Sequence, residues 1–189
     1  MEHLADADVR AVVLLEGASD VAAVRAVAEG RGLDLAGLGV VLVPMGGATN
    51  VRRHVERFGP GGLGVPLAGL YDAAEERFFR RALRTDALAA SGFFRCLPDL
   101  EHELIRALGV DEVTRVITAE GELASLRLLQ QQPAERDRTD VEHLHRFLGV
   151  RGGRKARYAG LLARALEPGQ VPRPLRALVD HVLTTAVAE

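Results

Sequence analysis

The sequence predicts an α/β fold in which a mainly parallel, four-stranded sheet is flanked by helices and followed by an α-helical C-terminal part. Two observations carry this prediction. Up to residue 97, short aliphatic runs typical of buried strands alternate with stretches whose apolar residues recur at helical spacing. From residue 99 onward only the helical spacing remains. Strands that alternate with helices in this way imply right-handed crossovers and a parallel sheet.

The first half of the chain contains the strands. We expect them at residues 9–15, 39–45, 65–71 and 93–97, with helices between them at 21–28, 51–58 and 74–84. Ser19 or Asp20 is placed to cap the first helix, and Thr49 or Asn50 the second. We therefore assign residues 8–98 to the α/β core.

The second half has the hydrophobic pattern of packed helices. Its apolar residues recur at intervals of three and four, and Pro133, Gly149 and the segment 168–174 interrupt them. We expect four to six helices in residues 99–189, packed on the core. With 189 residues, 48% of them hydrophobic, the chain can bury one sizeable core.

The composition argues against several classes of protein. A net charge of −2 excludes a protein that coats nucleic acid by bulk attraction, so any such contact must come from local patches. No apolar run approaches the roughly 20 residues of a membrane span, and the N-terminus lacks the features of a signal peptide. The single cysteine, Cys96, cannot form an internal disulfide and is expected to be buried. We therefore expect a cytoplasmic protein with no membrane partner.

Three carboxylates are expected to meet at one edge of the sheet. Glu16 directly follows the first strand, and Asp72 follows the third. The carboxyl ends of parallel strands share an edge, where open α/β sheets bind their ligands. Asp20 lies one helical turn beyond Glu16. Three carboxylates in one place favour a shared Mg²⁺ or Mn²⁺, although surface carboxylates at loop edges and a helix start are an alternative interpretation.

These segments resemble a Toprim domain. The motif E-G-x-x-D stands at residues 16–20, P-x-G-G at residues 44–47, and an aspartate, Asp72, ends the third strand. The combination is most similar to the OLD (overcoming lysogenization defect) branch of nucleases and covers residues 9–97. The resemblance implies a Toprim-like sheet and phosphodiester chemistry on nucleic acid that depends on Mg²⁺ or Mn²⁺.

The resemblance also implies roles for individual residues. Glu16 matches a glutamate that acts as metal ligand or acid/base, while Asp20 and Asp72 match metal ligands. A later acidic residue helps to hold the metal in this branch, and we choose Glu101, with Asp99 in reserve.

A lysine in the C-terminal helices can stabilise charge on the transferring phosphate in this family. Lys155 fits this role, and it is the only lysine of the chain. We therefore predict Glu16 and Lys155 as the catalytic residues.

The chain departs from the family pattern after the third strand. The second aspartate of the family's D-x-D motif should stand at Ala74. Glu75 can still reach the site with its longer side chain, which would make a D-x-x-E variant. A two-metal mechanism, cleavage with one metal, and phosphate binding without cleavage all remain open at this point.

Arginine clusters are the expected contacts to nucleic acid. We select Arg52, Arg53, Arg154 and Arg157 as nucleic-acid-binding residues. Ion pairs with glutamates on solvated helix faces are an equally good interpretation.

Other polar features have simpler interpretations. The glycine-rich loop at residues 46–49 fits a tight turn better than a phosphate cradle. His102, His143 and His145 show no ligand-like spacing and are interpreted as surface or boundary residues.

The sequence thus predicts a metal-dependent DNA endonuclease or nickase built on a Toprim site. The chain lacks the G-x-x-x-x-G-K-[ST] motif of the ATPase module found in OLD proteins, so a separate ATPase is a candidate partner. A homodimer is a further candidate assembly. One alternative is a catalytically degenerate Toprim module that binds nucleic acid or a protein. A receiver-like domain fits poorly, because its lysine should closely follow a fifth strand.

Overall fold

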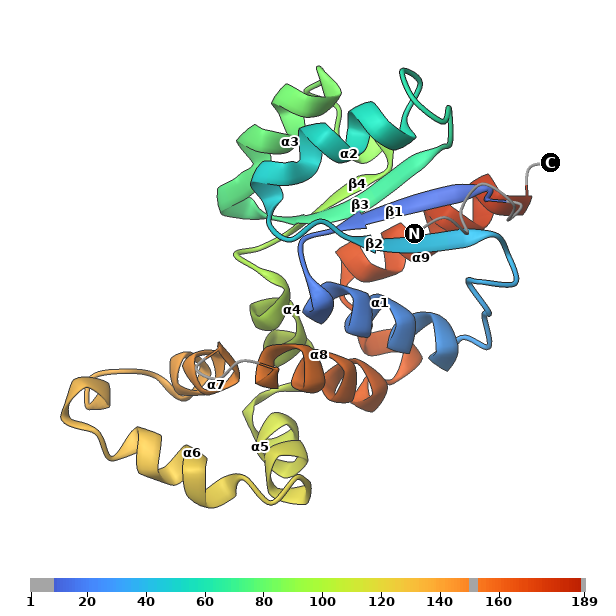
Figure 1. Ribbon diagram of the computed structural model, residues 1–189. Helices are drawn as coiled ribbons and strands as arrows, with labels where there is room; N and C mark the ends of the chain where they lie inside the picture. The colour runs from blue at the N-terminus through green and yellow to red at the C-terminus, as the bar shows by residue number, and fades with distance from the viewer. Residues whose placement is uncertain (1–8, 150–152, 188–189) are drawn as a thin grey trace.

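A computed structural model describes residues 9–149 and 153–187 (Figure 1). At the centre of these residues is a parallel sheet in the order β2-β1-β3-β4. Its four strands are β1 (Ala11–Leu15), β2 (Val40–Pro44), β3 (Leu67–Asp72) and β4 (Phe93–Cys96). The predicted four-stranded parallel sheet is therefore confirmed, and each strand ends within one residue of its predicted end.

Helices cover both faces of the sheet (Figure 1). On one face lie α2 (Val51–Phe58) and α3 (Glu76–Leu83), packed side by side; on the other lie α1 (Ala18–Gly30) and α9 (Arg173–Val187). The side chains of β1 alternate between these layers: Val12 and Leu14 pack toward α2 and α3, whereas Val13 and Leu15 pack toward α1 and α9. Because β1 is buried on both faces, its sequence is an unbroken run of aliphatic residues.

Six helices follow β4 in the described residues, as the sequence predicts. They are α4 (Leu100–Leu108), α5 (Val110–Ala119), α6 (Leu123–Gln130), α7 (Asp140–Gly149), α8 (Arg154–Ala165) and α9. Figure 1 shows α5, α6 and α7 as a lobe beside the α/β body, while α8 returns to pack along α1. The helical half and the sheet share one hydrophobic core, since Leu104 and Tyr158 belong to the same buried cluster as Leu15.

Short 3₁₀ turns precede two helices: α2 starts at Val51 as predicted, whereas α3 starts at Glu76, two residues later than predicted. One covers Ala48–Asn50 before α2, and the other covers Ala73–Glu75 before α3. Asn50 occupies the N-cap position of α2, as predicted, but its side chain does not cap the helix; its amide instead donates to the carbonyl groups of Met45 and Gly46, at 3.0 and 3.1 Å. These hydrogen bonds link the start of α2 to the turn after β2.

Two other expectations concern the cysteine and the absence of membrane-spanning segments. Cys96 is buried, as predicted. In the described ranges, none of the helices is both long and apolar enough to cross a membrane.

Candidate metal centre

The carboxyl ends of β1 and β3 form the point where the sheet changes winding direction. The chain passes from β1 outward to β2 and then crosses over to β3 on the other side of β1. Crevices at such switch points are where open α/β sheets bind ligands. Glu16 follows β1 and Asp72 ends β3, so the structure brings both to this edge.

The turn after β2 fixes the backbone of Glu16. The amide groups of Gly46 and Gly47 both donate to the Glu16 carbonyl, at 3.0 and 3.1 Å. Both glycines have positive φ angles, +72° and +115°, which side-chain-bearing residues rarely adopt. Because these amides are engaged, the loop is the tight turn favoured by the sequence and not a phosphate cradle.

Asp20 lies in the first turn of α1 and is only 8% exposed. Its Oδ2 accepts a hydrogen bond from the Gly17 amide at 2.8 Å, which fixes the carboxylate against the start of the helix. Burial raises the pKa of Asp20 to about 6; repulsion from Glu101 and Glu16 adds to the shift, while the Gly17 hydrogen bond and Lys155 oppose it.

Asp72 ends β3, and the 3₁₀ turn that follows it brings Glu75 close enough to Glu16 and Asp20 to interact with both. Burial raises the pKa of Asp72 to about 7, and the charges of Asp20 and Glu16 add to the shift. The pKa of Glu75 is also raised to about 7, by burial and by a hydrogen bond and charge repulsion with Glu16. Glu75 therefore reaches the site, whereas Ala74 is exposed to solvent.

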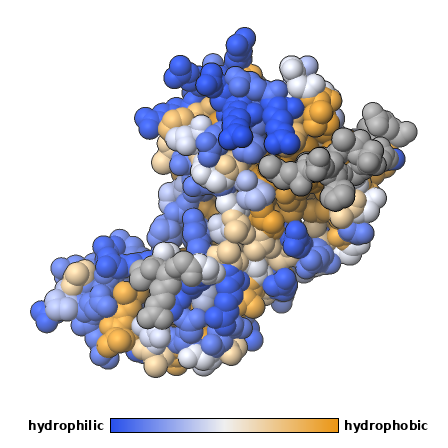
Figure 2. All heavy atoms as spheres, viewed as in Figure 1, coloured by the Kyte–Doolittle hydropathy of each residue, from blue (hydrophilic) through white to orange (hydrophobic). Residues whose placement is uncertain are grey.

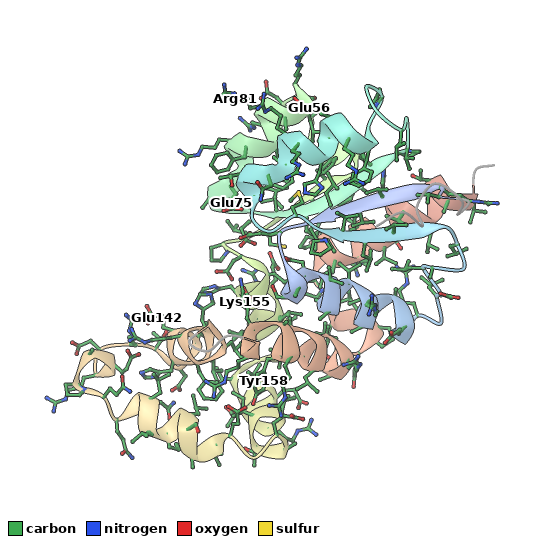
Figure 3. The ribbon with its side chains drawn as sticks, viewed as in Figure 1. Glu56, Glu75, Arg81, Glu142, Lys155 and Tyr158 are labelled. Atoms are coloured by element: carbon green, nitrogen blue, oxygen red, sulfur yellow. The ribbon has the colours of Figure 1, made fainter. Side chains whose placement is uncertain are left out.

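The helical half contributes Glu101 from α4 and Lys155 from α8. Glu101 is 4% exposed, and its Oε2 lies 3.2 Å from the Lys155 Nζ. Burial raises the pKa of Glu101 despite this ion pair. The pKa of Lys155 is raised, because attraction to Glu101, Asp20 and Asp72 exceeds the cost of its burial. Figure 3 shows Glu75 at the end of the α/β layer that faces the helical half and Lys155 at the start of α8.

The donor chemistry of this carboxylate cluster suits a hard divalent cation, although among the described residues no three of these carboxylates bring one oxygen each within 4.8 Å of one another. The cluster consists of Glu16, Asp20, Asp72, Glu75 and Glu101. Within the described part of the chain, the buried oxygens Glu75 Oε2 and Glu101 Oε1 have no hydrogen-bond partner. Buried, unpartnered carboxylate oxygens are costly, and one lysine cannot neutralise five carboxylates. A cation with several oxygen ligands, such as Mg²⁺ or Mn²⁺, would satisfy both needs.

Asp99 lies beside the cluster but has different partners. Its Oδ1 accepts from the amide of His102 and contacts that residue's Nδ1, both at 2.9 Å, while its Oδ2 lies 2.8 Å from His145 Nε2. The prediction that His102 and His145 are ordinary surface or boundary residues is therefore incomplete. His102 and His145 are 43 positions apart in the sequence, so spacing could not reveal the pairing, which depends on the packing of α7 against α4. His143 is 8% exposed and hydrogen-bonds the Glu135 carbonyl.

The predicted DNA-binding arginines fall into two groups. Arg52 and Arg53 are exposed on α2, where Arg52 lies 3.7 Å from Glu56 of the same helix. Both are available to an external phosphate.

Arg154 and Arg157 are instead engaged within the protein. Arg154 has a side chain only 9% exposed; it pairs with Glu122 and lies over the Phe147 ring. Arg157 pairs with Glu120 and Glu122. This geometry argues against the predicted DNA contact for Arg154, because its guanidinium holds α8 to the α5–α6 loop and to α7.

Comparison with known proteins agrees with the fold and the motifs. Residues 9–73 match the family model described as "Overcoming lysogenization defect protein-like, TOPRIM domain". The structure is similar to the C-terminal region of the Xanthomonas campestris pv. campestris OLD protein, with a TM-score of 0.76 and 26% identity over 95% of both chains. It is also similar to the C-terminal region of the Burkholderia pseudomallei OLD protein, with a TM-score of 0.74 and 22% identity over 95% of this chain and 100% of that chain. Comparison with curated protein sequences found no match. The resemblance indicated by the motifs is thereby confirmed.

Proposed function

We propose that this chain, with its OLD-like Toprim domain, is a divalent-metal-dependent nuclease that cuts or nicks DNA. The observation that carries the proposal is the convergence of five carboxylates and Lys155 at the switch point of the sheet. A site built only to stabilise the fold would not gather buried carboxylates whose oxygens lack partners.

Each residue of the cluster has a role in this proposal. Glu16, Asp20, Asp72, Glu75 and Glu101 would hold Mg²⁺ or Mn²⁺. When bound, the cation would polarise the phosphodiester and lower the pKa of a bound water. Two hydrogen bonds to its carbonyl fix the backbone of Glu16 at the end of β1, from which its carboxylate would reach the cation. Lys155, half exposed and held by Glu101, is placed to offset charge that develops on the phosphate.

The DNA backbone has a suitable surface on the layer formed by α2 and α3. Five exposed arginines there form no ion pair with an acidic group in the ranges that the structure covers: Arg53, Arg57, Arg77, Arg81 and Arg84. Figure 2 shows a strongly hydrophilic surface over these helices. Because α3 begins directly after Glu75, this basic layer adjoins the carboxylate cluster. We propose that Arg52 and Arg53 contact phosphates here.

The test is a nicking assay on supercoiled plasmid with Mg²⁺ or Mn²⁺. The parent protein is expected to convert the plasmid to the nicked form, and EDTA to abolish the conversion. Glu16→Gln is expected to reduce the rate at least about 100-fold, because the substitution removes a charged ligand at constant shape. Glu56→Gln is the matched control, since Glu56 is an exposed glutamate of α2 outside the cluster.

Two outcomes would overturn the proposal. If the parent cuts no DNA with either metal at high protein concentration, the nuclease assignment fails. If Glu16→Gln cuts as fast as Glu56→Gln, the activity does not come from this site.

Ala74 at the second position of the family's D-x-D motif favours a second candidate function. A degenerate module would bind DNA or a protein without cutting it. It predicts DNA retention that survives both EDTA and Glu16→Gln. A function driven by nucleotide hydrolysis would in addition require a separate ATPase. Adding an ATPase to the plasmid assay tests this requirement.

A further inference from the structure

We propose that Asp99, His102 and His145 form a second metal site, which takes Zn²⁺ and is distinct from the carboxylate cluster. This inference does not depend on the nuclease activity. It assigns a ligand to a side-chain group that the proposed function does not use.

Three side chains from two separate helices converge in this second metal site. Asp99 and His102 stand at the start of α4, and His145 comes from α7. One donor atom of each lies within 4.8 Å of the other two. The two imidazole rings lie with their centroids 3.9 Å apart. Among the residues that the structure describes, this group alone combines three side chains in a metal-binding arrangement under that distance.

Both imidazoles already face the carboxylate of Asp99. Asp99 Oδ1 lies 2.9 Å from His102 Nδ1, and Asp99 Oδ2 lies 2.8 Å from His145 Nε2. Two ligands at about 2.0–2.1 Å from a tetrahedral Zn²⁺ are roughly 3.3 Å apart. The two carboxylate–imidazole distances are therefore only about half an ångström shorter than those between zinc ligands. The His102 amide, which donates to Asp99, keeps the carboxylate directed at the rings.

The chemistry of the donors selects the metal. Two imidazoles with one carboxylate suit Zn²⁺, whereas Mg²⁺ prefers oxygen ligands. The carboxylate cluster is made of oxygen donors alone, so the two sites differ in the ions that they prefer. The three side chains of the second metal site are 22–35% exposed, which leaves a path for the ion and room for a water ligand.

An ion bound at this position would link two parts of the structure. It would join the first turn of α4 to α7 and so fix the lobe of α5, α6 and α7 relative to the α/β body. Asp99 also lies near enough to Asp72 to act on it electrostatically. A cation held by Asp99 would therefore change the electrostatic potential at the carboxylate cluster.

The experiment measures Zn²⁺ binding by the whole chain after removal of metals, by calorimetry in excess Mg²⁺. The Mg²⁺ occupies oxygen-donor sites and leaves the histidine site to Zn²⁺. We expect one equivalent of Zn²⁺ to bind. His102→Ala and His145→Ala are each expected to weaken binding on the order of 100-fold or more, since each removes a ligand. His54→Ala, at a histidine of α2, and Glu16→Gln are expected to bind as the parent does.

A second measurement does not depend on variants that fold poorly. X-ray absorption of the Zn²⁺-loaded parent is expected to show two imidazole ligands. Absence of binding in excess Mg²⁺ would overturn the proposal, as would binding that both histidine substitutions leave intact or a spectrum without imidazole. None of these results bears on plasmid nicking, so the two proposals fail independently.

Discussion

Four carboxyl groups of the cluster hold protons more tightly than ordinary surface acids: Asp20, Asp72, Glu75 and Glu101. Burial raises the pKa of Asp20 to about 6 and those of Asp72 and Glu75 to about 7. Near neutral pH a proton and a cation therefore compete for the same oxygens. This competition gives the metal-free protein a measurable pH dependence.

We expect the metal-free protein to be less stable at pH 8 than at pH 5. An aspartate has a pKa of about 3.9 when unfolded, so the folded protein binds the extra proton of Asp72 between about pH 4 and 7. The stability that this proton confers is present at low pH and is lost as the pH rises through 7. Asp20 and Glu75 act in the same direction.

Asp72→Asn is the variant that tests this pH dependence. It is expected to raise the free energy of unfolding at pH 8 by about 1–2 kcal/mol, a value reduced because Asp72 is partly exposed. The free energy of unfolding should also fall less between pH 5 and pH 8 than it does in the parent. Urea unfolding in EDTA measures it, with the exposed Asp86→Asn as control. A fall as steep in Asp72→Asn as in the parent would contradict the assignment.

Lys155 is expected to matter for stability as well as for catalysis. Lys155→Met leaves the buried Glu101 without its cation and is expected to lower the free energy of unfolding by about 1–2 kcal/mol at pH 8. Adding Glu101→Gln to this variant should recover most of the loss, because the carboxylate in contact with Lys155 then carries no charge. Urea unfolding of the single and double variants measures the coupling. An equal loss of unfolding free energy in the single and the double variant would show that the ion pair between Lys155 and Glu101 does not contribute to stability.

At the scale of elements, the short 3₁₀ turn after β3 decides which side chain enters the site. Asp72 still has extended backbone, and Glu75 is the last residue of the 3₁₀ turn that follows it. Residue 74 is turned by about 120° from Glu75. A D-x-D spacing requires a different backbone path at this point from the D-x-x-E spacing found here.

Exchanging the two positions tests this geometry. Glu75→Ala is expected to weaken Mn²⁺ binding about 10-fold or more, and adding Ala74→Asp is expected not to restore it. Calorimetric Mn²⁺ titration measures both variants. Glu76→Ala serves as the control, because Glu76 pairs with Arg80 and Arg95 outside the cluster. Restoration by Ala74→Asp would mean that the site follows the family's D-x-D pattern.

The sequence predicts those features of the elements that depend on local patterns. Aliphatic runs ending in Glu16 and Asp72 set the strand ends, and these were correct to within one residue. Features that depend on packing between distant helices were not predictable. The contact of His145 with Asp99 and the burial of Arg154 against Phe147 arise only when α7 and α8 assemble. Spacing within a helix carries no information about such contacts.

At the scale of the whole molecule, the carboxylate cluster joins the two halves of the chain. Glu16, Asp20, Asp72 and Glu75 come from the α/β body, whereas Glu101 and Lys155 come from helices of the second half. The site is therefore incomplete without the helical part, even though the motifs that identify it lie within residues 16–72. A bound cation should consequently stabilise both halves together.

We expect Mn²⁺ to raise the melting temperature of the chain and to protect both halves from hydrogen exchange. At 100 times the dissociation constant, a cation that binds only the folded state adds about 2.7 kcal/mol. For a protein of this size that corresponds to roughly 5–10 °C. Exchange should slow at the start of α1, after β3 and in α4 and α8. Glu101→Gln should reduce the rise in melting temperature and remove the protection of α4 and α8. If Mn²⁺ protects only the α/β segments of the parent, the helical half does not hold the metal.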